Sequence, residues 1–405
     1  MTKQTACPAK EERYANLIPM KELQFEKDRL FPFPIYEKLR KSFPVRYDKQ
    51  RDCWDVFKYD DVQFVLKNPK HFSSKRGIQA ESILTMDPPK HTKLRALVNK
   101  SFTPKAVKQI ETRIKDVTAL LLQEARQKDT IDMIDDIAGP LPVIIIAEML
   151  GAPIEDRHII KTYSDVLVAG AKDSSDKSVA DMVQKRRDGY AFLSNYFRDI
   201  LLKRRAHPKE DLITMLLQSE VDGEYLTEEQ LLGFCILLLV AGNETTTNLI
   251  ANAVRYITED TAMQQQIRQN TDYVPNIIEE TLRYYPPVQA IGRVAAEDIA
   301  LGGAFIKKGS SVISWVASAN RDEAKFSEPD RFIINRPSYP HLSFGFGIHF
   351  CLGAPLARLE AKIALSSLLS MSAYIKQADD EQKLEAVPSP FVFGVKHLPV
   401  RIEFK

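Results

Sequence analysis

The sequence predicts a mainly α-helical fold with small peripheral β-sheets. Apolar residues recur at helical spacing through most of the segment 104–283, and this period indicates amphipathic helices. Two short runs, 54–57 and 312–316, are rich in the β-branched and aromatic residues typical of strands. Because no internal repeat, low-complexity tract or long Gly/Ser/Pro-rich linker divides the chain, we expect one domain over residues 26–405, preceded by a loosely ordered leader over residues 1–25.

Composition and charge exclude several classes of protein. A chain of 405 residues with 44% hydrophobic content can bury a large core. Lys plus Arg number 56 and Asp plus Glu 54, so no overall field favours nucleic acid or an anionic membrane. The first ten residues lack the apolar segment of a signal peptide, and the longest apolar run, 234–241, is far shorter than the roughly 20 residues that span a bilayer. We expect a soluble protein without a membrane anchor.

The cysteines indicate a reducing compartment. Cys7, Cys53, Cys235 and Cys351 are scattered, include no CxxC pair, and are too few to staple a chain of this length. Structural disulfides are rare in the cytosol. A cytoplasmic location is therefore the prediction.

A long helix is predicted from residue 228 onwards. Thr227 is a candidate N-cap, Gln230 completes a capping box, and Leu226 with Leu231 forms a hydrophobic staple. The helical pattern continues for about thirty residues, whereas globular helices average about 11 or 12. Because the run 234–241 is apolar on every side, this helix should cross the interior.

Polar residues interrupt this helix directly after its apolar run. The segment 241–246 reads Ala-Gly-Asn-Glu-Thr-Thr, so small residues open space beside an acid and a hydroxyl, Glu244 and Thr245. Burying such groups is costly unless they are bonded or used. The ordinary interpretations are that Thr245 bonds to a carbonyl one turn earlier and that Glu244 is a solvated or capped side chain.

A lone cysteine stands in a glycine-spaced loop near the C-terminus. The segment 344–353 reads Phe-Gly-Phe-Gly-Ile-His-Phe-Cys-Leu-Gly and runs into a predicted helix at Ala354. Gly345 and Gly347 permit backbone conformations closed to other residues, their amides can point at the Cys351 sulfur, and a helix N-terminus favours negative charge there. A thiolate so placed can be the axial ligand of a haem iron. The alternative is a small buried hydrophobe in an ordinary turn.

Six positions of this loop match a known family in register. They resemble the cysteine-ligand loop of the cytochrome P450 family: Phe344, Gly345, Gly347, His349, Cys351 and Gly353. The segment 241–246 is similar to the family's distal motif, and the resemblance extends from about residue 32 to the C-terminus. It implies a helix-rich triangular prism with haem b between the long helix and the cysteine loop, and it is strongest for Bacillus members of the 109 type.

The resemblance also assigns roles to residues. Cys351 would be the iron ligand, and Thr245 and Glu244 would be the catalytic pair that manages protons for oxygen activation. Glu244 stands where some bacterial members have aspartate. Other positions would contact the cofactor: His91, Arg95, Ala241, Arg293, Phe344, Gly345, His349 and Gly353.

Four of these cofactor positions would bind haem propionates. His91 and Arg95 lie one turn apart after a Pro-Pro helix entry and can share one face. In the family this HxxxR helix binds a propionate, and Arg293 and His349 match other positions that do the same. For the neighbouring lysines, Lys90, Lys93 and Lys100, a solvated basic face is the ordinary interpretation.

Glu280 and Arg283 are three residues apart, a spacing that suits an intrahelical ion pair. Followed by Tyr-Tyr-Pro-Pro, they resemble the family's structural ExxR element, whose pair binds a further basic residue downstream. Arg331 and Arg336 are both candidates for that third member.

The substrate positions implied by the family are mostly apolar and suggest a hydrophobic substrate such as a fatty acid, terpenoid or steroid. For each of them plain core packing is the alternative. They are Ile83, Leu84, Leu237, Ala241, Val288, Ala290, Phe391 and Val392.

The resemblance implies a monooxygenase that uses O2 and hydroxylates its substrate. Because the chain carries no fused reductase, electrons would come from a ferredoxin or flavodoxin with its reductase, docked around Arg358 and nearby lysines. We expect a monomer that binds no nucleic acid. Two alternatives remain: a peroxygenase, which typically replaces the acid–alcohol pair by an arginine, and a non-catalytic haem-thiolate sensor.

Overall fold

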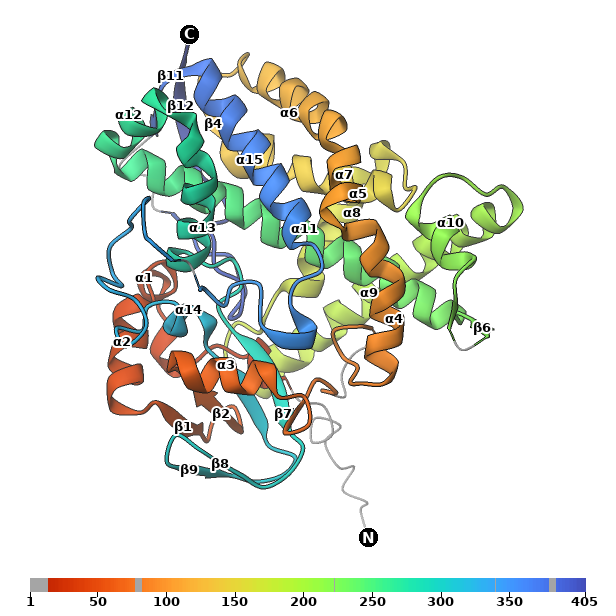
Figure 1. Cartoon of the computed structure of the whole chain (residues 1–405), viewed down its shortest axis with the longest axis vertical. Helices are drawn as coiled ribbons and strands as arrows, with labels where there is room; N and C mark the ends of the chain where they lie inside the picture. The colour runs from red at the N-terminus through yellow and green to blue at the C-terminus, as the bar shows by residue number, and fades with distance from the viewer. Residues whose placement is uncertain (1–13, 77–81, 222, 339, 379–383) are drawn as a thin grey trace.

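Helices make up most of the molecule, and the largest sheet lies to one side of them (Figure 1). A computed structural model describes residues 14–76, 82–221, 223–338, 340–378 and 384–405. The five-stranded sheet lies on the same side of the molecule as α1, α2, α3 and α14, whereas α12, α13 and α15 contact the long helix α11 and α6 packs against α15. The predicted mainly α fold with small peripheral sheets is confirmed.

The connections between consecutive helices range from one residue, between α11 and α12, to the long segments that flank α14. Their bounds are α1 Glu26–Leu30, α2 Phe33–Ser42, α3 Tyr59–Lys67, α4 Lys90–Asn99, α5 Pro104–Gln109, α6 Glu111–Ala125, α7 Pro140–Met149, α8 Arg157–Val168, α9 Asp176–Ala206, α10 Leu212–Leu217, α11 Glu228–Glu259, α12 Thr261–Gln269, α13 Val274–Tyr284, α14 Val316–Ala319 and α15 Ala354–Met371.

Four small sheets complete the described fold. The five-stranded sheet has the order β1-β2-β10-β7-β3, in which only the β2–β10 pair is parallel. The others have the orders β11-β12-β4, β5-β6 and β8-β9. The strands are β1 Val45–Asp48, β2 Cys53–Val56, β3 Phe72–Ser73, β4 Ile131–Asp132, β5 Glu220–Val221, β6 Glu224–Tyr225, β7 Ile291–Ala295, β8 Ile299–Leu301, β9 Ala304–Ile306, β10 Ser311–Ser314, β11 Ser372–Gln377 and β12 Pro399–Phe404. Strands β2 and β10 fall on the two predicted runs.

Helix α11 begins where its capping signals predict. The Gln230 amide donates to Thr227 Oγ1 at 3.3 Å, and the Thr227 amide donates to Gln230 Oε1 at 3.0 Å. Among the described helices, α11 alone is long and apolar enough by composition to cross a membrane, but 72% of its most apolar window is buried inside the protein. It is therefore a core helix, and its burial fixes the position of the residues in its middle.

The described part of the expected leader is packed rather than loose. Leu17, Met20 and Leu23 are buried, and Met20 and Leu23 belong to the same apolar cluster as Phe33 and Tyr36 of α2. Residues 14–25 therefore contribute to the core. Residues 1–13, including Cys7, lie outside the described residues, and the described cysteines are free thiols.

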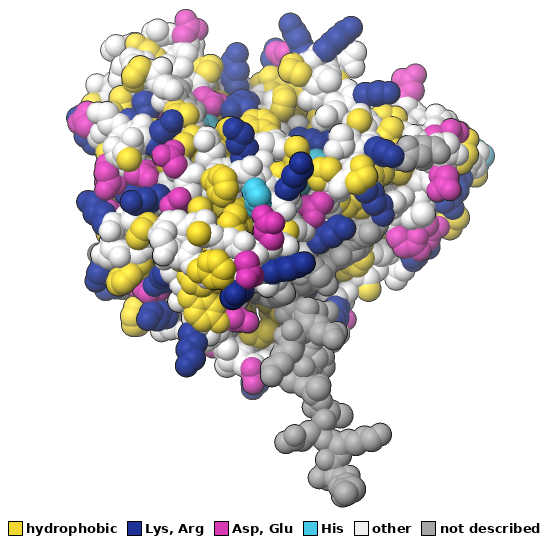
Figure 2. All heavy atoms as spheres, turned by 60° about the horizontal axis from the view of Figure 1, so that its bottom comes forward, with side chains coloured by type: hydrophobic (Ala, Val, Ile, Leu, Met, Phe, Trp, Pro, Cys, Tyr) yellow, Lys and Arg dark blue, Asp and Glu magenta, His cyan; other side chains and the backbone are white. Residues whose placement is uncertain are grey.

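The surface carries both signs of charge. On the face drawn in Figure 2, Lys and Arg side chains are interspersed with Asp and Glu rather than gathered into one field. This mixing agrees with the near balance of 56 basic and 54 acidic residues in the sequence.

A buried ion-pair cluster ties α13 to the segment that follows α14. Arg283 donates from Nη2 and Nε to the Glu280 carboxylate at 2.7 and 2.8 Å, and both side chains are fully buried. Arg336 completes the cluster, because its Nε lies 3.2 Å from both Glu280 oxygens. The Arg331 side chain is instead exposed and pairs with Glu328, while its carbonyl accepts a hydrogen bond from Arg283. The structure thus separates two candidates that the sequence left equal.

We predict that Glu280→Ala lowers the free energy of unfolding by about 3–5 kcal/mol, because two buried guanidinium groups lose their counter-ion. Denaturant unfolding of the protein measures this loss. Glu328→Ala is the matched control, since it removes only an exposed pair and should change stability little. Equal losses in both variants would contradict a structural role for Glu280.

Candidate active site

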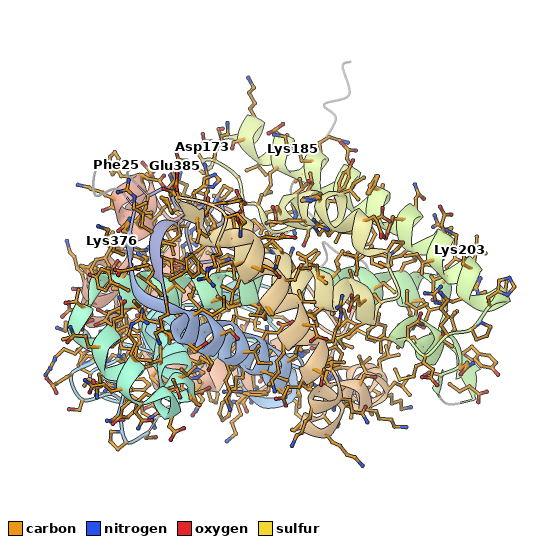
Figure 3. All side chains as sticks on the ribbon, turned by 90° about the horizontal axis from the view of Figure 1, so that it is seen from above. Phe25, Asp173, Lys185, Lys203, Lys376 and Glu385 are labelled. Atoms are coloured by element: carbon orange, nitrogen blue, oxygen red, sulfur yellow. The ribbon has the colours of Figure 1, made fainter. Side chains whose placement is uncertain are left out.

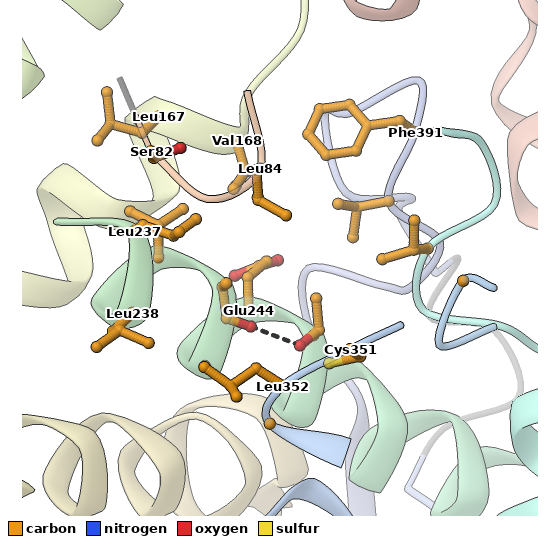
Figure 4. A pocket seen from close by; sticks show the side chains of 18 of the residues that line it. Ser82, Leu84, Leu167, Val168, Leu237, Leu238, Glu244, Cys351, Leu352 and Phe391 are labelled. Carbon is orange, nitrogen blue, oxygen red and sulfur yellow. Dashed lines mark hydrogen bonds between the residues drawn. The ribbon is translucent and has the colours of Figure 1, made fainter. Parts of the chain in front are cut away.

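A cavity of about 630 Å³ separates the middle of α11 from the loop that precedes α15. Its lining is mostly apolar and includes Cys351 from the loop and Glu244 and Thr245 from α11. Figure 4 shows Cys351 on one side of this space and Leu84 and Phe391 on the other. A molecule in the cavity would therefore lie between a thiol and an apolar wall.

The backbone presents the Cys351 sulfur through positive dihedral angles. Gly345 and Gly347 have φ of 72° and 71°, a region that favours glycine. The Cys351 amide donates to the Phe344 carbonyl at 2.8 Å, which closes the loop. The expectation that the Gly345 amide points at the sulfur is wrong, because this amide donates to the Leu342 carbonyl at 2.8 Å.

The amides that reach the sulfur belong to the start of α15 instead. Burial raises the pKa of the Cys351 thiol, whereas hydrogen bonds from the Gly353 and Ala354 amides and the charge of Arg95 act in the opposite direction. The thiolate is thus partly stabilised by its loop, and a metal cation at the sulfur would complete its deprotonation.

On α11 the acid and the alcohol occupy different environments. Thr245 Oγ1 donates to the Ala241 carbonyl at 2.7 Å, which is the ordinary helical bond. Both residues line the cavity. The bond satisfies the Thr245 proton, while the lone pairs of Oγ1 stay open to a group in the cavity.

Glu244 is buried, which rules out the solvated side chain that was one expectation. Only 8% of it is exposed, and Asn248 Nδ2 donates to its Oε1 at 3.0 Å. Burial, and then the charge of Asp165 on α8, raise the pKa of Glu244 to about 7. Lys161 in turn donates to the Asp165 carboxylate at 2.9 Å.

This arrangement connects the cavity with solvent. The Asp165 side chain is hydrogen-bonded to Glu244 and 44% exposed. Asp165 therefore lies between the buried Glu244 carboxyl and the protein surface. Sequence reasoning missed Asp165 and Lys161, because no local pattern relates α8 to the middle of α11.

Basic groups cluster at another wall of the site, where Arg95, Arg293 and His349 line the cavity and His91 packs against His349. His91, 1% exposed, has no partner for either ring nitrogen, and its ring lies 4.2 Å from that of His349. Burial, and then the charge of Arg293, lower the pKa of His349 to about 3. Arg95 donates to the Phe350 carbonyl and Arg293 to the Gly292 carbonyl. Within the described residues no carboxylate pairs with any of the four predicted propionate ligands, so this wall favours an anionic ligand.

All eight predicted substrate positions lie on the cavity lining: Ile83, Leu84, Leu237, Ala241, Val288, Ala290, Phe391 and Val392. The sequence did not indicate Leu167 and Val168 of α8 or Tyr190 of α9, which join the same wall. Glu360 of α15 was also missed; it lines the cavity, and burial raises its pKa to about 8.

Comparison with known proteins gives the family. Residues 23–403 match the model of the family described as Cytochrome P450. The chain belongs to the cytochrome P450 family. It is 83% identical to Cytochrome P450 109 of Bacillus spizizenii over the full length of both chains, and 42% identical to the putative cytochrome P450 YjiB of Bacillus subtilis over 93% of this chain and 95% of that one.

Solved structures agree. CYP109E1 from Bacillus megaterium in complex with testosterone superposes with a TM-score of 0.90 and 43% identity, covering 93% of this chain and 99% of that chain. CYP109B1 from Bacillus subtilis superposes with a TM-score of 0.84 and 43% sequence identity, covering 92% of this chain and 100% of that chain. The predicted P450 fold and the resemblance to the 109 type are confirmed, and the chain is a cytochrome P450 monooxygenase with a haem-thiolate cofactor.

The residues of the cavity fit this cofactor. Haem brings an iron cation, which suits a half-buried thiol that lines the cavity, and two carboxylates, which suit basic groups that have no carboxylate partner among the described residues. The two ring nitrogens of His91, which have no hydrogen-bond partner among the described residues, are the strongest indication of a ligand, because a buried polar atom without a partner is costly. Cys351 would hold the iron, and His91, Arg95, Arg293 and His349 would hold the carboxylates.

We predict that Glu244→Gln changes how stability depends on pH. The pKa of Glu244 is raised from 4.5 to about 7 in the folded protein, so between these values the folded state binds more protons than the unfolded state. Its contribution to stability is complete below about pH 4.5 and is lost as pH rises to about 7. The variant cannot lose this contribution. As pH rises over that range, its free energy of unfolding should therefore increase by more than about 1 kcal/mol relative to that of wild type.

Unfolding of the haem-loaded proteins at several pH values measures this difference. Glu229→Gln, at the exposed start of the same helix, is the control. Parallel stability curves for wild type and Glu244→Gln would show that the buried carboxyl does not titrate as its surroundings imply.

Proposed function

We propose that this P450 hydroxylates a hydrophobic small molecule, with electrons from a separate redox protein. One observation supports this above all: a single, mostly apolar cavity joins the Cys351 thiol to Thr245 and Glu244. When bound, haem uses two electrons and two protons to cleave O2, placing one oxygen atom in a C–H bond and releasing the other as water. The relative CYP109E1 has been solved with testosterone and with corticosterone, so a steroid-sized substrate is consistent with this cavity.

The chain's own residues would position the cofactor and the substrate. Cys351 would ligate the iron through its thiolate, which donates electron density and favours O–O cleavage. Ala241 leaves space beside the cofactor because its side chain is a single methyl group. Phe344, Gly345 and Gly353 shape the loop around the sulfur, and the apolar wall would hold the substrate by excluding water.

Thr245 and Glu244 would supply protons. The Thr245 hydroxyl bonds to the Ala241 carbonyl at 2.7 Å and can turn from it to donate into the cavity. Glu244 titrates near neutral pH and can both accept and release a proton under ordinary conditions. Asp165 would reload it from solvent.

The electron donor would be a ferredoxin or flavodoxin with its reductase. Arg358 is a weaker docking group than we expected, because Glu279 accepts hydrogen bonds from its Nε and Nη2 at 2.5 and 3.0 Å. We further propose that the enzyme works as a cytoplasmic monomer.

The first test is the carbon monoxide difference spectrum of the reduced protein beside Cys351→Ser. We expect a strongly red-shifted Soret band in wild type that the variant loses, because only a thiolate ligand gives this shift. A band unaffected by the substitution would contradict Cys351 as the iron ligand.

A second prediction concerns coupling. Thr245→Ala should consume oxygen with the redox partner while product per oxygen falls about tenfold or more, because proton delivery contributes that much or more. Thr247→Ala is a matched control, since Thr247 makes the same helical bond at 3.0 Å but is absent from the described cavity lining.

The competing activities give other results in the same assay. Full activity of wild type with peroxide and none with reductant would favour a peroxygenase. A sensor would show no turnover to lose.

A further inference from the structure

The cavity extends beyond the cofactor wall to α9, where its lining becomes basic. Arg76, Arg186 and Arg187 enter the lining there, in addition to Arg95 and Arg293 of the cofactor wall. Among the described lining residues the carboxylates are Glu244 and Glu360, on α11 and α15. Arg76 and Arg186 are therefore basic lining residues in addition to Arg95 and Arg293, which face the place of the two haem carboxylates.

Arg186 lies on the cavity-facing stripe of α9. Val183 and Tyr190, about one turn before and after it, also line the cavity, as the helical period requires. Arg186 Nη1 donates to the Ala169 carbonyl, in the connection after α8, at 3.2 Å. This bond anchors one edge of the guanidinium, and its other donors stay available to a ligand.

Arg76 lines the same cavity as Arg186, and no counter-ion pairs with it among the described residues. It follows β3, passes Gly292 of β7, and makes no hydrogen bond or ion pair within the described residues. Burial, and then the charge of Arg76, lower the pKa of Arg186 to about 10. Two partly buried cations that repel each other are costly without an anion between them.

We propose that Arg186, with Arg76 beside it, binds the carboxylate of an amphipathic substrate, so that the preferred substrates are hydrophobic carboxylic acids such as fatty acids. Guanidinium groups match a carboxylate with two parallel hydrogen bonds. This inference rests on the proposed function and narrows its substrate class.

The same placement determines how such a substrate lies. A carboxylate at α9 leaves the hydrocarbon chain against Leu84, Val168 and Phe391, which Figure 4 shows across the cavity from Cys351. The carbon nearest the iron would therefore be far from the carboxylate. Arg76 also adjoins Arg293 of the cofactor wall and lowers its pKa, so Arg186 is the diagnostic residue.

The test is a spin-state titration of the haem-loaded protein with a saturated long-chain fatty acid, its methyl ester and testosterone. Wild type should bind the acid about tenfold more tightly than the ester, because a charge-assisted pair is lost in the ester. Arg186→Met should remove this preference, Arg186→Lys should keep part of it, and testosterone, which has no carboxylate, should bind all three proteins equally.

Lys185→Met is the matched control. Lys185 precedes Arg186 in the chain, but it is 63% exposed and pairs with Asp181, and Figure 3 shows it at the outer edge of the molecule. This variant should keep the preference for the acid. An unchanged carbon monoxide spectrum in every variant shows that the fold and the cofactor site are intact.

Either of two results overturns the inference: equal binding of acid and ester by wild type, or a preference that survives in Arg186→Met. A preference lost in Arg76→Met but not in Arg186→Met also overturns the assignment to Arg186. The titration needs no turnover, so a measured preference for the acid would still support carboxylate binding if the protein failed to hydroxylate the substrate. Equal binding of acid and ester would leave hydroxylation standing.

Discussion

The position of the cysteine loop depends on the buried charge of Glu280. That carboxylate holds Arg283 and Arg336, and Arg283 also donates to the Asn320 carbonyl at 3.0 Å. Asn320 then bonds to the Ser343 hydroxyl and the Leu342 amide, each at 2.8 Å, directly before the loop that carries Cys351. A chain of buried polar contacts thus runs from α13 to the sulfur loop. Because buried polar groups tolerate few arrangements, the cluster fixes the loop opposite α11.

The site contains groups that are unfavourable for stability. Within the described residues, one wall holds basic side chains without carboxylate partners, including His91 with both ring nitrogens unsatisfied, and another holds Glu244 with a pKa raised to about 7. An ordinary core would not retain either arrangement. Both are explained by ligands and protons that the protein must bind.

Local sequence patterns predicted most of this organisation. The capping box at Thr227 marked the start of α11, and the motif around Cys351 marked the thiol, because each depends on neighbours within a few residues. The same reasoning expected the amides of Gly345 and Gly347 to point at the sulfur, whereas the Gly345 amide donates to the Leu342 carbonyl and the amides of Gly353 and Ala354 donate to the sulfur. Which amide faces an atom depends on the path of the whole loop, and residue type does not specify that path.

The sequence by itself determined the helical architecture, the family and the residues able to carry the chemistry, because hydrophobic period and motif spacing are local properties. Tertiary structure alone decided that Arg336 rather than Arg331 meets Glu280, that Asp165 reaches Glu244, and that Arg186 enters the cavity. The physical reason is common to all three. Each contact joins elements far apart in the chain, and only the packing of α8, α9, α11 and α13 sets their separation and burial.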